Sequence, residues 1–358
     1  MNYRQTQILA QKTLAASGTE VIDLDVQDPI SAIMFEYRNT RGGITDIEHL
    51  MACLTKVELV DGADVLFSLS GKQMQALDYY DAGMSSYTFN TWGIGIQELA
   101  GFTYHFGRKL WDPRLALDTK RFRNPQLKIT HNRALKDAAS SAHEIKIIGY
   151  VFDERAPAPE GFLMSKEIKA FTSGAADSYE YTDLPLDHPI RKLLIYAYDD
   201  AYSPHQVVKE IRISENNDRK VPVDEGLSTV MKAVNSLYPR WCETLYGPLT
   251  AVVSDHYITP GFDAVVTGAG EGVAGYVGVE AGALHSPVGL YANGNLTMRC
   301  QVSGFNPHSV VPLDFGDQQD PADWYDVTKL GNLKARVKAG TAGTAGAVAL
   351  FAQQFRRY

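Results

Sequence analysis

Apolar residues alternate with polar ones in several short runs of the chain, as they do in β-strands that bury one face. The clearest runs are KVELV from Lys56, EIKIIGYVF from Glu144, KEIRI from Lys209 and AVALFAQQF from Ala347. Gly, Pro, Asn and Asp separate such runs, and helical periodicity is confined to a few segments. The pattern predicts an antiparallel sandwich or barrel rather than alternating strands and helices.

Two short helices are predicted inside this β-structure. The first follows a Ser-x-x-Gln capping box formed by Ser70 and Gln73. The second is predicted to be capped by Asp224, and its apolar residues recur every three or four positions on one face. These residues are Leu227, Met231, Val234 and Tyr238.

The amino terminus is predicted to form a helical arm over residues 1–19. Wound as a helix, it places Tyr3, Ala10 and Leu14 on one face. The apolar face is narrow, so the arm would bind a bilayer only weakly by itself. Packing of this helix on its own domain is the alternative to contact with a neighbouring subunit or a membrane.

The same order of motifs occurs twice along the chain. DLDVQDPISAIMFEY from Asp23 matches DLPLDHPIRKLLIYAY from Asp183, and each is followed by one of the alternating strands and one of the helices. FGRKLWDPRLALDTKRFRNPQLK from Phe106 then matches FGDQQDPADWYDVTKLGNLK from Phe315. Because the blocks keep their order, an internal duplication explains them better than chance.

The second copy is longer than the first between its helix and the Phe-Gly motif. The extra segment includes residues 261–296, which are rich in Gly, Ala and Val. Long insertions lie at the surface and often carry recognition, which indicates a protruding β-rich loop or tower. A flexible excursion without a partner is the alternative.

These patterns together predict a mainly β protein of two tandem antiparallel jelly-roll domains with short helices. The expected division is 1–19 amino-terminal helical arm, 20–155 first jelly roll, 156–177 linker and 178–358 second jelly roll, with the Gly-rich insertion at about 240–310. A chain of 358 residues is long enough for two cores of this size.

Charge and cysteine content narrow the class of function. The net charge of −8 argues against a basic surface for nucleic-acid phosphates, so no sequence-specific nucleic-acid binding is expected. Cys53, Cys242 and Cys300 are odd in number and far apart, which suits assembly in a reducing cytoplasm rather than a disulfide framework. The amino terminus has no apolar run typical of a signal peptide or an anchor.

The sequence assigns no catalytic, cofactor-binding or metal-binding residues. The nine histidines lack the spacing of a metal site. Gly270, Gly272 and Gly275 spell G-x-G-x-x-G, but no helix pattern follows to bind a phosphate. The acidic run from Asp314 to Asp323 offers oxygens to Ca²⁺, although a solvated turn is the simpler interpretation.

Two blocks of the second copy, HPIRKLLIYAYDD and KEIRISENNDRKVPV, resemble a known family together with FGRKLWDPRLALDTKRFRNPQLKITHN of the first copy. The chain is similar to the double-jelly-roll major capsid proteins of tailless icosahedral bacteriophages and related viruses, many of which enclose a membrane. The resemblance implies a non-enzymatic virion protein, assembled in the host cytoplasm, whose homotrimers form pseudo-hexagonal capsomers of an icosahedral shell. It implies contacts with neighbouring capsomers, with penton and minor capsid proteins, and with an internal membrane through the amino-terminal arm.

A glycan-binding or glycan-hydrolysing protein of two jelly rolls is the alternative function. It would need converging carboxylates or exposed aromatic side chains for sugar stacking. Four tryptophans are available for stacking: Trp92, Trp111, Trp241 and Trp324. Core packing explains them more simply. A minor capsid or spike protein is a third possibility with the same fold.

Overall fold

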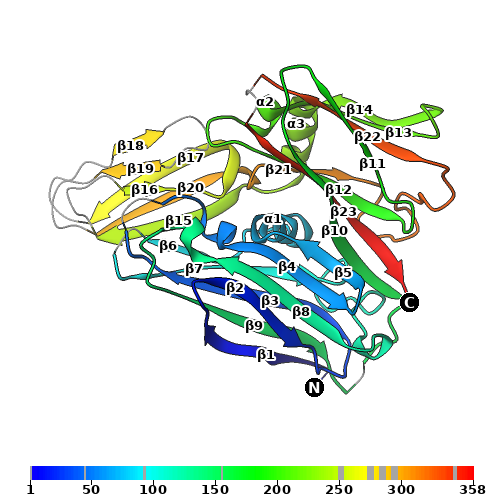
Figure 1. The fold of residues 1–358 in the computed structure, drawn as a ribbon, viewed down its shortest axis with the longest axis horizontal. Coiled ribbons are helices and arrows are strands. Elements are labelled where there is room, and N and C mark those ends of the chain that lie inside the picture. The colour runs from blue at the N-terminus through cyan, green and yellow to red at the C-terminus, as the bar shows by residue number, and fades with distance from the viewer. Residues whose placement is uncertain are drawn as a thin grey trace.

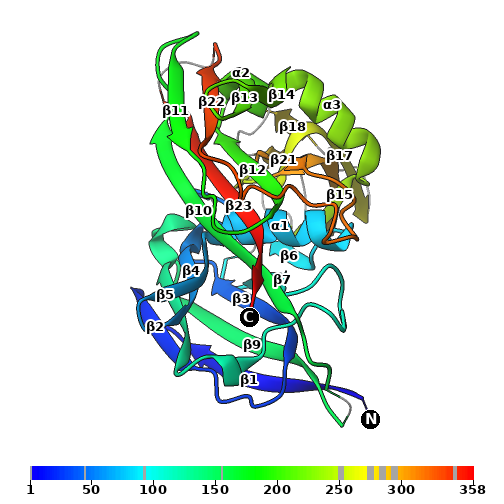
Figure 2. The ribbon, with the colours of Figure 1, turned by 90° about the vertical axis from the view of Figure 1, so that its right-hand side faces the viewer.

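The computed structural model describes residues 2–43, 46–91, 94–154, 156–248, 254–271, 278–281, 288–291, 297–341 and 345–358. Two β-sandwiches lie one above the other, and an insertion projects to one side (Figures 1 and 2). The elements of the first half are β1 (Tyr3–Thr13), β2 (Ser17–Asp23), β3 (Ile30–Thr40), η1 (Leu50–Cys53), β4 (Leu54–Asp61), β5 (Asp64–Leu69), α1 (Gly71–Ala82), β6 (Thr88–Thr91), β7 (Gln97–His105), η2 (Thr119–Arg121), β8 (Pro125–Asn132), η3 (Arg133–Leu135) and β9 (Ala142–Phe152).

The second half repeats this series and adds strands before β21. Its repeated elements are β10 (Gly161–Thr172), β11 (Tyr179–Asp183), β12 (Ile190–Tyr198), α2 (Pro204–Val207), β13 (Val208–Glu215), β14 (Lys220–Gly226), α3 (Leu227–Leu237), β21 (Val310–Asp314), β22 (Leu333–Ala339) and β23 (Ala347–Arg357). The added strands are β15 (Trp241–Pro248), β16 (Ser254–His256), β17 (Pro260–Glu271), β18 (Gly278–Ala281), β19 (Val288–Tyr291) and β20 (Thr297–Pro307).

Each half forms two facing sheets with the same strand order. The first sandwich has the orders β1-β9-β3-β7 and β2-β8-β4-β5, and the second has β10-β23-β12-β21 and β11-β22-β13-β14. Strand for strand, the two orders are identical once β1 is matched with β10. This is the jelly-roll arrangement, present twice, so the predicted fold class is confirmed.

Hydrogen bonds repeat with the fold and verify the internal alignment. Phe106 N–H donates to the Ser31 carbonyl, and Phe315 N–H donates to the Arg191 carbonyl, both at 3.0 Å. The closing strands also match, because Phe152 bonds to Pro29 as Phe355 bonds to Pro189. One predicted match is wrong: Leu184 bonds to Leu333 as Leu24 bonds to Pro125, so Leu333 corresponds to Pro125 and not to Leu127.

The repeated Phe-Gly motif has a steric cause. A Cβ atom on Gly107 would lie 2.5 Å from the Leu115 carbonyl oxygen, and one on Gly316 would lie 2.1 Å from the Asp323 carbonyl oxygen. Both glycines therefore allow the chain to fold back on itself just after the strand. The close approach of a later carbonyl oxygen recurs in both copies, while only Gly316 has a positive φ, of 68°.

The amino-terminal residues form a strand, so the predicted helical arm is wrong. β1 pairs with β9 from Tyr3, opposite Phe152, to Thr13, opposite Glu144. An edge strand buries little of either face, so its apolar and polar residues alternate only weakly. The spacing of Tyr3, Ala10 and Leu14 therefore matched a helical face by chance. Backbone hydrogen bonding to the long strand β9 stabilises the extended conformation of β1.

The predicted linker over residues 156–177 is also wrong, because it contains a strand that lies inside a sheet. β10 occupies Gly161–Thr172 and pairs with β23 over its whole length. It is the counterpart of β1, so both jelly rolls begin earlier than residues 20 and 178. The other domain bounds stay predictions.

The two sandwiches are joined through their sheets. β5 pairs in parallel with β10 at Ser68 and Lys166, and β6 pairs in parallel with β15 at Asn90 and Leu245. The second contact attaches the base of the insertion to the first jelly roll, not only to the second. In its described parts the insertion is β-rich, and it projects beyond both sandwiches (Figure 1).

The structure explains why one predicted helix cap is right and the other is wrong. Ser70 Oγ accepts the Gln73 N–H at 3.3 Å, and the Gln73 side chain accepts the Ser70 N–H at 2.8 Å. Asp224, in contrast, lies in β14 opposite Arg212, and Gly226 is the N-cap of α3. The hairpin of β13 and β14 continues up to the start of the helix, so Asp224 lies in a strand and forms a cross-strand ion pair with Arg212.

Replacing Ser70 with alanine should lower the free energy of unfolding by about 1 kcal/mol, because the Gln73 amide loses its acceptor. The matched control Asp224→Ala should cost less than about 0.5 kcal/mol, since it removes an exposed ion pair and no cap. Urea unfolding followed by circular dichroism measures both changes. Equal losses for the two variants would contradict the assignment of the caps.

Candidate functional site

Helix α1 lies between the two jelly rolls and contacts both (Figure 2). Toward the first, Gln75 Nε2 donates to the Gly101 carbonyl at 3.0 Å, and Asp78 Oδ2 accepts the Thr103 N–H at 2.9 Å. These bonds satisfy the edge of β7 beyond the point where β6 ends. A helix thus replaces a neighbouring strand at this edge.

The opposite face of α1 binds the second jelly roll. Tyr80 donates its hydroxyl to the Val310 carbonyl at 2.7 Å, and Tyr79 donates to the Pro239 carbonyl. Leu194, Val310 and Phe351, on the outer face of the second sandwich, belong to the same apolar core as the helix. Residues Gly71–Tyr80 are consequently all buried.

A closed ring of three polar side chains fastens this junction. Arg191 Nη1 contacts Asp81 Oδ1 at 2.7 Å and Gln353 Oε1 at 2.8 Å, and Gln353 Nε2 donates to Asp81 Oδ2 at 2.7 Å. The Asp81 and Arg191 side chains are each 2% exposed. Desolvating a buried ion pair costs free energy, and the hydrogen bonds that Gln353 makes with both partners help to offset this cost.

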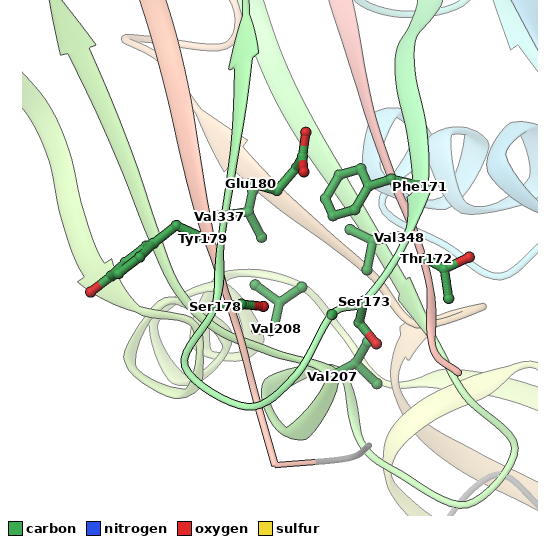
Figure 3. Close-up of a pocket in the computed structure, with 12 residues that line it drawn as sticks. Phe171, Thr172, Ser173, Ser178, Tyr179, Glu180, Val207, Val208, Val337 and Val348 are labelled. Atoms are coloured by element: carbon green, nitrogen blue, oxygen red, sulfur yellow. The ribbon is translucent and has the colours of Figure 1, made fainter. Parts of the chain in front are cut away.

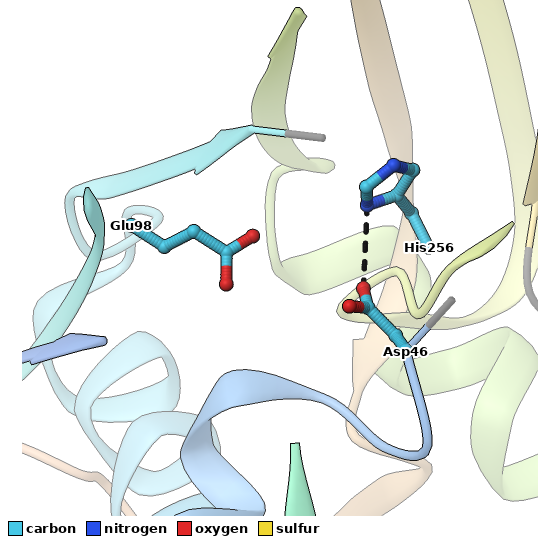
Figure 4. A group of neighbouring side chains, drawn as sticks. All are labelled: Asp46, Glu98 and His256. Atoms are coloured by element: carbon cyan, nitrogen blue, oxygen red, sulfur yellow. Dashed lines mark ion pairs between the residues drawn. The ribbon is translucent and has the colours of Figure 1, made fainter. Parts of the chain in front are cut away.

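A second polar network joins the first jelly roll to the base of the insertion. Lys136 Nζ lies 2.6 Å from Asp46 Oδ2 and 3.6 Å from Glu98 Oε2. Arg41 pairs with both carboxylates at 3.1 and 3.4 Å. His256, which comes from the insertion, places Nδ1 3.2 Å from Asp46 Oδ2 (Figure 4). All five side chains are at most 2% exposed.

Burial and neighbouring charge drive the two carboxylates of this network in opposite directions. Burial would raise the pKa of Asp46, but Lys136, His256 and Arg41 outweigh burial and lower it to about 2. Burial, together with the negative charge of Asp46, raises the pKa of Glu98 to about 7 despite Lys136 and Arg41. Burial also lowers the pKa of His256, which is therefore neutral at pH 7.

Asp46, Glu98 and His256 are the one group of three potential metal ligands that lies together among the described residues, with ligand atoms within 4.8 Å of one another. The Lys136 ammonium bonds to Asp46 and also lies near Glu98, so a cation of the protein already occupies the place that a metal ion would take. The geometry fits an internal ion-pair network better than a metal site. Sequence reasoning missed it because its five members come from four distant segments without a motif.

Two buried histidines extend the polar contacts at the junction. The His49 and His308 rings lie 4.6 Å apart, and burial lowers the pKa of both well below the usual value. His49 Nε2 is 3.1 Å from Thr259 Oγ1, and His308 Nε2 is 2.7 Å from Gln75 Oε1. The neutral rings therefore link parts of the molecule by hydrogen bonds: His49 links the first jelly roll to the insertion, and His308 binds α1.

The structure uses the acidic run from Asp314 to Asp323 for its own turns. Asp317 and Asp320 accept the amides of residues two positions later, at 2.8 and 3.0 Å, and Asp323 accepts the Asp317 amide at 2.7 Å. Asp314, at the start of the run, forms an ion pair with Lys192 at 3.0 Å. These contacts support the solvated turn over a calcium site.

The tryptophans offer little for sugar stacking. Trp241 and Trp324 are 0% and 3% exposed. Trp111 stacks on Tyr3 at 4.4 Å between ring centroids and packs against Phe152. Trp92 lies outside the described residues, as do Gly272 and Gly275 of the glycine pattern. Gly270 is in β17, so a strand precedes the pattern.

A small, partly open cavity lies at an end of the second sandwich, beneath the turn that joins β10 to β11 (Figure 3). It has a volume of about 90 Å³, and Phe171, Val207, Val208, Val337 and Val348 supply its apolar lining. Ligand pockets for small organic molecules usually exceed about 300 Å³. The cavity has room for a few water molecules and indicates no substrate.

The chain has the double-jelly-roll fold of viral capsid proteins, although no family model and no curated protein sequence matches it. The major capsid protein of Sulfolobus turreted icosahedral virus aligns with TM-score 0.63 and 10% identity, covering 99% of this chain and 96% of that chain. The major capsid protein P2 of bacteriophage PM2 gives 0.56 and 9%, with 99% and 98% covered. PBCV-1 VP54 gives 0.57 and 12%, with 99% and 94% covered.

Removing the charge of Asp81 should destabilise the junction strongly. Asp81→Ala leaves Arg191 buried without its carboxylate, and we expect a loss of about 3 to 5 kcal/mol in the free energy of unfolding. Asp64→Ala, which breaks the more exposed pair with Arg356, should cost about 1 kcal/mol or less. Asp81→Asn should fall between them because it keeps one acceptor. Chemical denaturation of the three variants measures these losses. Similar losses at Asp81 and Asp64 would contradict the proposal that the ring of Asp81, Arg191 and Gln353 stabilises the junction.

Glu98 should make stability depend on pH between about 4.5 and 7. Its pKa is higher in the folded than in the unfolded chain, so its contribution is complete below about pH 4.5 and is lost as the pH rises through 7. Relative to Glu98→Gln, the wild type should therefore lose about 3 kcal/mol over this range. Urea unfolding of both proteins at several pH values measures this difference in the free energy of unfolding. Glu160→Gln, at an exposed pair with Arg114, should run parallel to the wild type above pH 5, and a parallel curve for Glu98→Gln would refute the shift.

Proposed function

We propose that this chain is the major capsid protein of an icosahedral virus. The observation that carries the proposal is the duplicated jelly roll, which matches viral major capsid proteins over 99% of the chain. A ring with six similar positions can be built from three chains if each contributes two similar domains. Its homotrimers would form pseudo-hexagonal capsomers, and these would tile a closed shell.

The proposed role is structural rather than catalytic. The titratable clusters at the junction consist of buried ion pairs and hydrogen-bonded side chains, which fasten the parts of the chain to one another. The Lys136–Asp46 and Arg191–Asp81 pairs are each at most 2% exposed, so these charges face the protein interior. A shell protein needs this rigidity, because small changes in domain angle accumulate over many copies.

The proposed partners are other copies of the chain, neighbouring capsomers, and the penton and minor capsid proteins of the same virion. We propose no sequence-specific contact with nucleic acid, in line with the net charge of −8. Contact with an internal membrane was expected through an amino-terminal helix. Because Tyr3–Thr13 form β1, that route is no longer part of the proposal. None of the helices among the described residues is long and apolar enough to cross a membrane.

The alternative, a glycan-binding or glycan-hydrolysing protein, has less support. It needs exposed aromatic rings or an open acidic groove, whereas Trp241 and Trp324 are buried and the carboxylates of the Asp314 to Asp323 run accept bonds from the protein itself. The likeness to capsid proteins extends through both domains.

Purified protein should form particles of three times the 39.5 kDa chain mass, and these should associate further into shells as concentration rises. Mass photometry measures the first step, and negative-stain electron microscopy should show hexagonal outlines. A chain that stays monomeric at every concentration and salt condition, and that binds a polysaccharide on a glycan array, would replace the proposal with the alternative.

A further inference from the structure

We propose that the exposed face of α3 docks on the outer face of the first jelly roll of a second copy, and that this contact repeats the junction made by α1 within one chain. The inference rests on the proposed function, because it identifies the surfaces that join the copies. It follows from the duplication, since a chain with two similar domains has two similar helices and two similar sheet faces. Only one helix and one face meet within the chain.

The two helices correspond residue by residue. Their N-caps are Ser70 and Gly226. Counting from these caps, the residues that α1 turns toward its own jelly roll, Gly71, Gln75 and Asp78, match Leu227, Met231 and Val234, the three buried residues of α3. Each helix therefore sits on its own jelly roll in the same orientation.

The other faces of the two helices differ in their burial. In α1, the residues that contact the second jelly roll are Gln73, Leu77, Tyr80 and Asp81. Their counterparts in α3 are Thr229, Ala233, Ser236 and Leu237, and all four are exposed. Leu237 is 75% exposed, more than any other large apolar side chain among the described residues. The docking face of α3 is present, but no other described residue of the chain covers it.

The receiving faces correspond through the strand registers. In the second sheet, Leu194 pairs with Pro312 on one side and with Phe351 on the other. In the first sheet, Met34 pairs in the same way with Thr103 and Ile148. The next row outward likewise matches Gln353 with Tyr150. The first sheet therefore carries a counterpart of the surface that receives α1.

This counterpart surface is open and largely apolar. Leu194 and Phe351 are fully buried against the core that includes α1, whereas Met34 and Ile148 are only half-buried. A depression of about 320 Å³ lies over it, and its lining includes Met34, Thr103, Tyr150, Met84 and Tyr87. Met84 and Tyr87 at its rim are 66% and 70% exposed. A helix face of three small side chains and one exposed leucine matches one half of a junction that already exists, and the apolar depression matches the other half. The two surfaces lie on the same chain and fit one another in a second copy.

The arrangement also closes. Three chains supply three junctions of the α1 kind within chains and three of the α3 kind between chains, which alternate around the ring. Because each copy offers one α3 and one open sheet face, the contact is heterologous and continues until the third copy meets the first. No surface of this kind is then left over.

Leu237→Asp tests the proposal. A charge at the centre of the contact should convert particles of three times 39.5 kDa into 39.5 kDa monomers in mass photometry. The matched control is Val21→Asp, which changes a 54% exposed residue on β2, at the edge of its sheet farthest from β10. It should assemble like the wild type. Thermal unfolding checks that both variants remain folded.

A cysteine pair gives an independent measurement. In a Cys242→Ser background, Leu237→Cys combined with Tyr150→Cys should be joined by a short bismaleimide into covalent species of two and three chains on a denaturing gel. The pair Val21→Cys with Tyr150→Cys should remain monomeric.

The outcomes separate the contact from the function. If the wild type forms trimers, while Leu237→Asp also does and the cysteine pair is not joined, the copies meet elsewhere, so the proposed contact is wrong and the capsid function stands. If the wild type never assembles, both are wrong. Loss of trimers in Leu237→Asp alone, with specific joining of the cysteine pair, establishes the contact.

Discussion

The burial of α1 between the two jelly rolls is the constraint on which the rest of the structure depends. The helix satisfies the backbone of β7 with Gln75 and Asp78, and it covers the outer face of the second sheet with its other side. Neither half would be complete alone, since the first would expose the outer face of α1 and the second would expose Leu194 and Phe351. The Asp81, Arg191 and Gln353 ring then fixes the angle, because its hydrogen bonds tolerate little displacement.

The insertion is held by the same principle at a second place. Its base reaches the first jelly roll through β15, beside β6, and through His256 and Thr259, which meet Asp46 and His49. Buried polar groups of this kind contribute less to net stability than to the choice of one arrangement. The two jelly rolls and the base of the insertion are therefore fastened into one unit, as the proposed function in a shell would require.

Much of the fold could be predicted from the sequence, because jelly-roll strands with one buried face alternate clearly. The strands from Lys56 and Glu144 and the capping box at Ser70 illustrate this. Two strands were missed. The edge strand β1 was predicted to be a helix because it carries little periodicity, and β10, which lies between β5 and β23, was predicted to be a linker because its buried first half does not alternate. The antiparallel partners of both strands lie more than a hundred residues away. The junction could not be predicted either. Asp81, Arg191 and Gln353 share no motif, and an isolated sequence does not tell whether a neutral or a charged face of a helix will be covered.

The divergence between the two helices has a physical reason if the ring is built as proposed. Within the chain, Asp81 of α1 meets a buried arginine; at the matching position of α3 stands Leu237, and Ser31 stands where the second sheet has Arg191. A buried ion pair gains its energy only at close and well-aligned contact, and covalent connection of the two domains brings its partners together before that gain is needed. Separate chains must first meet by diffusion and reject misaligned encounters. An apolar contact is non-directional and carries a smaller penalty for imperfect first alignment, so copies can adjust before the ring closes. In the proposed ring, the junction within the chain is thus fastened by a rigid polar contact, and the matching junction between chains by an adaptable apolar one.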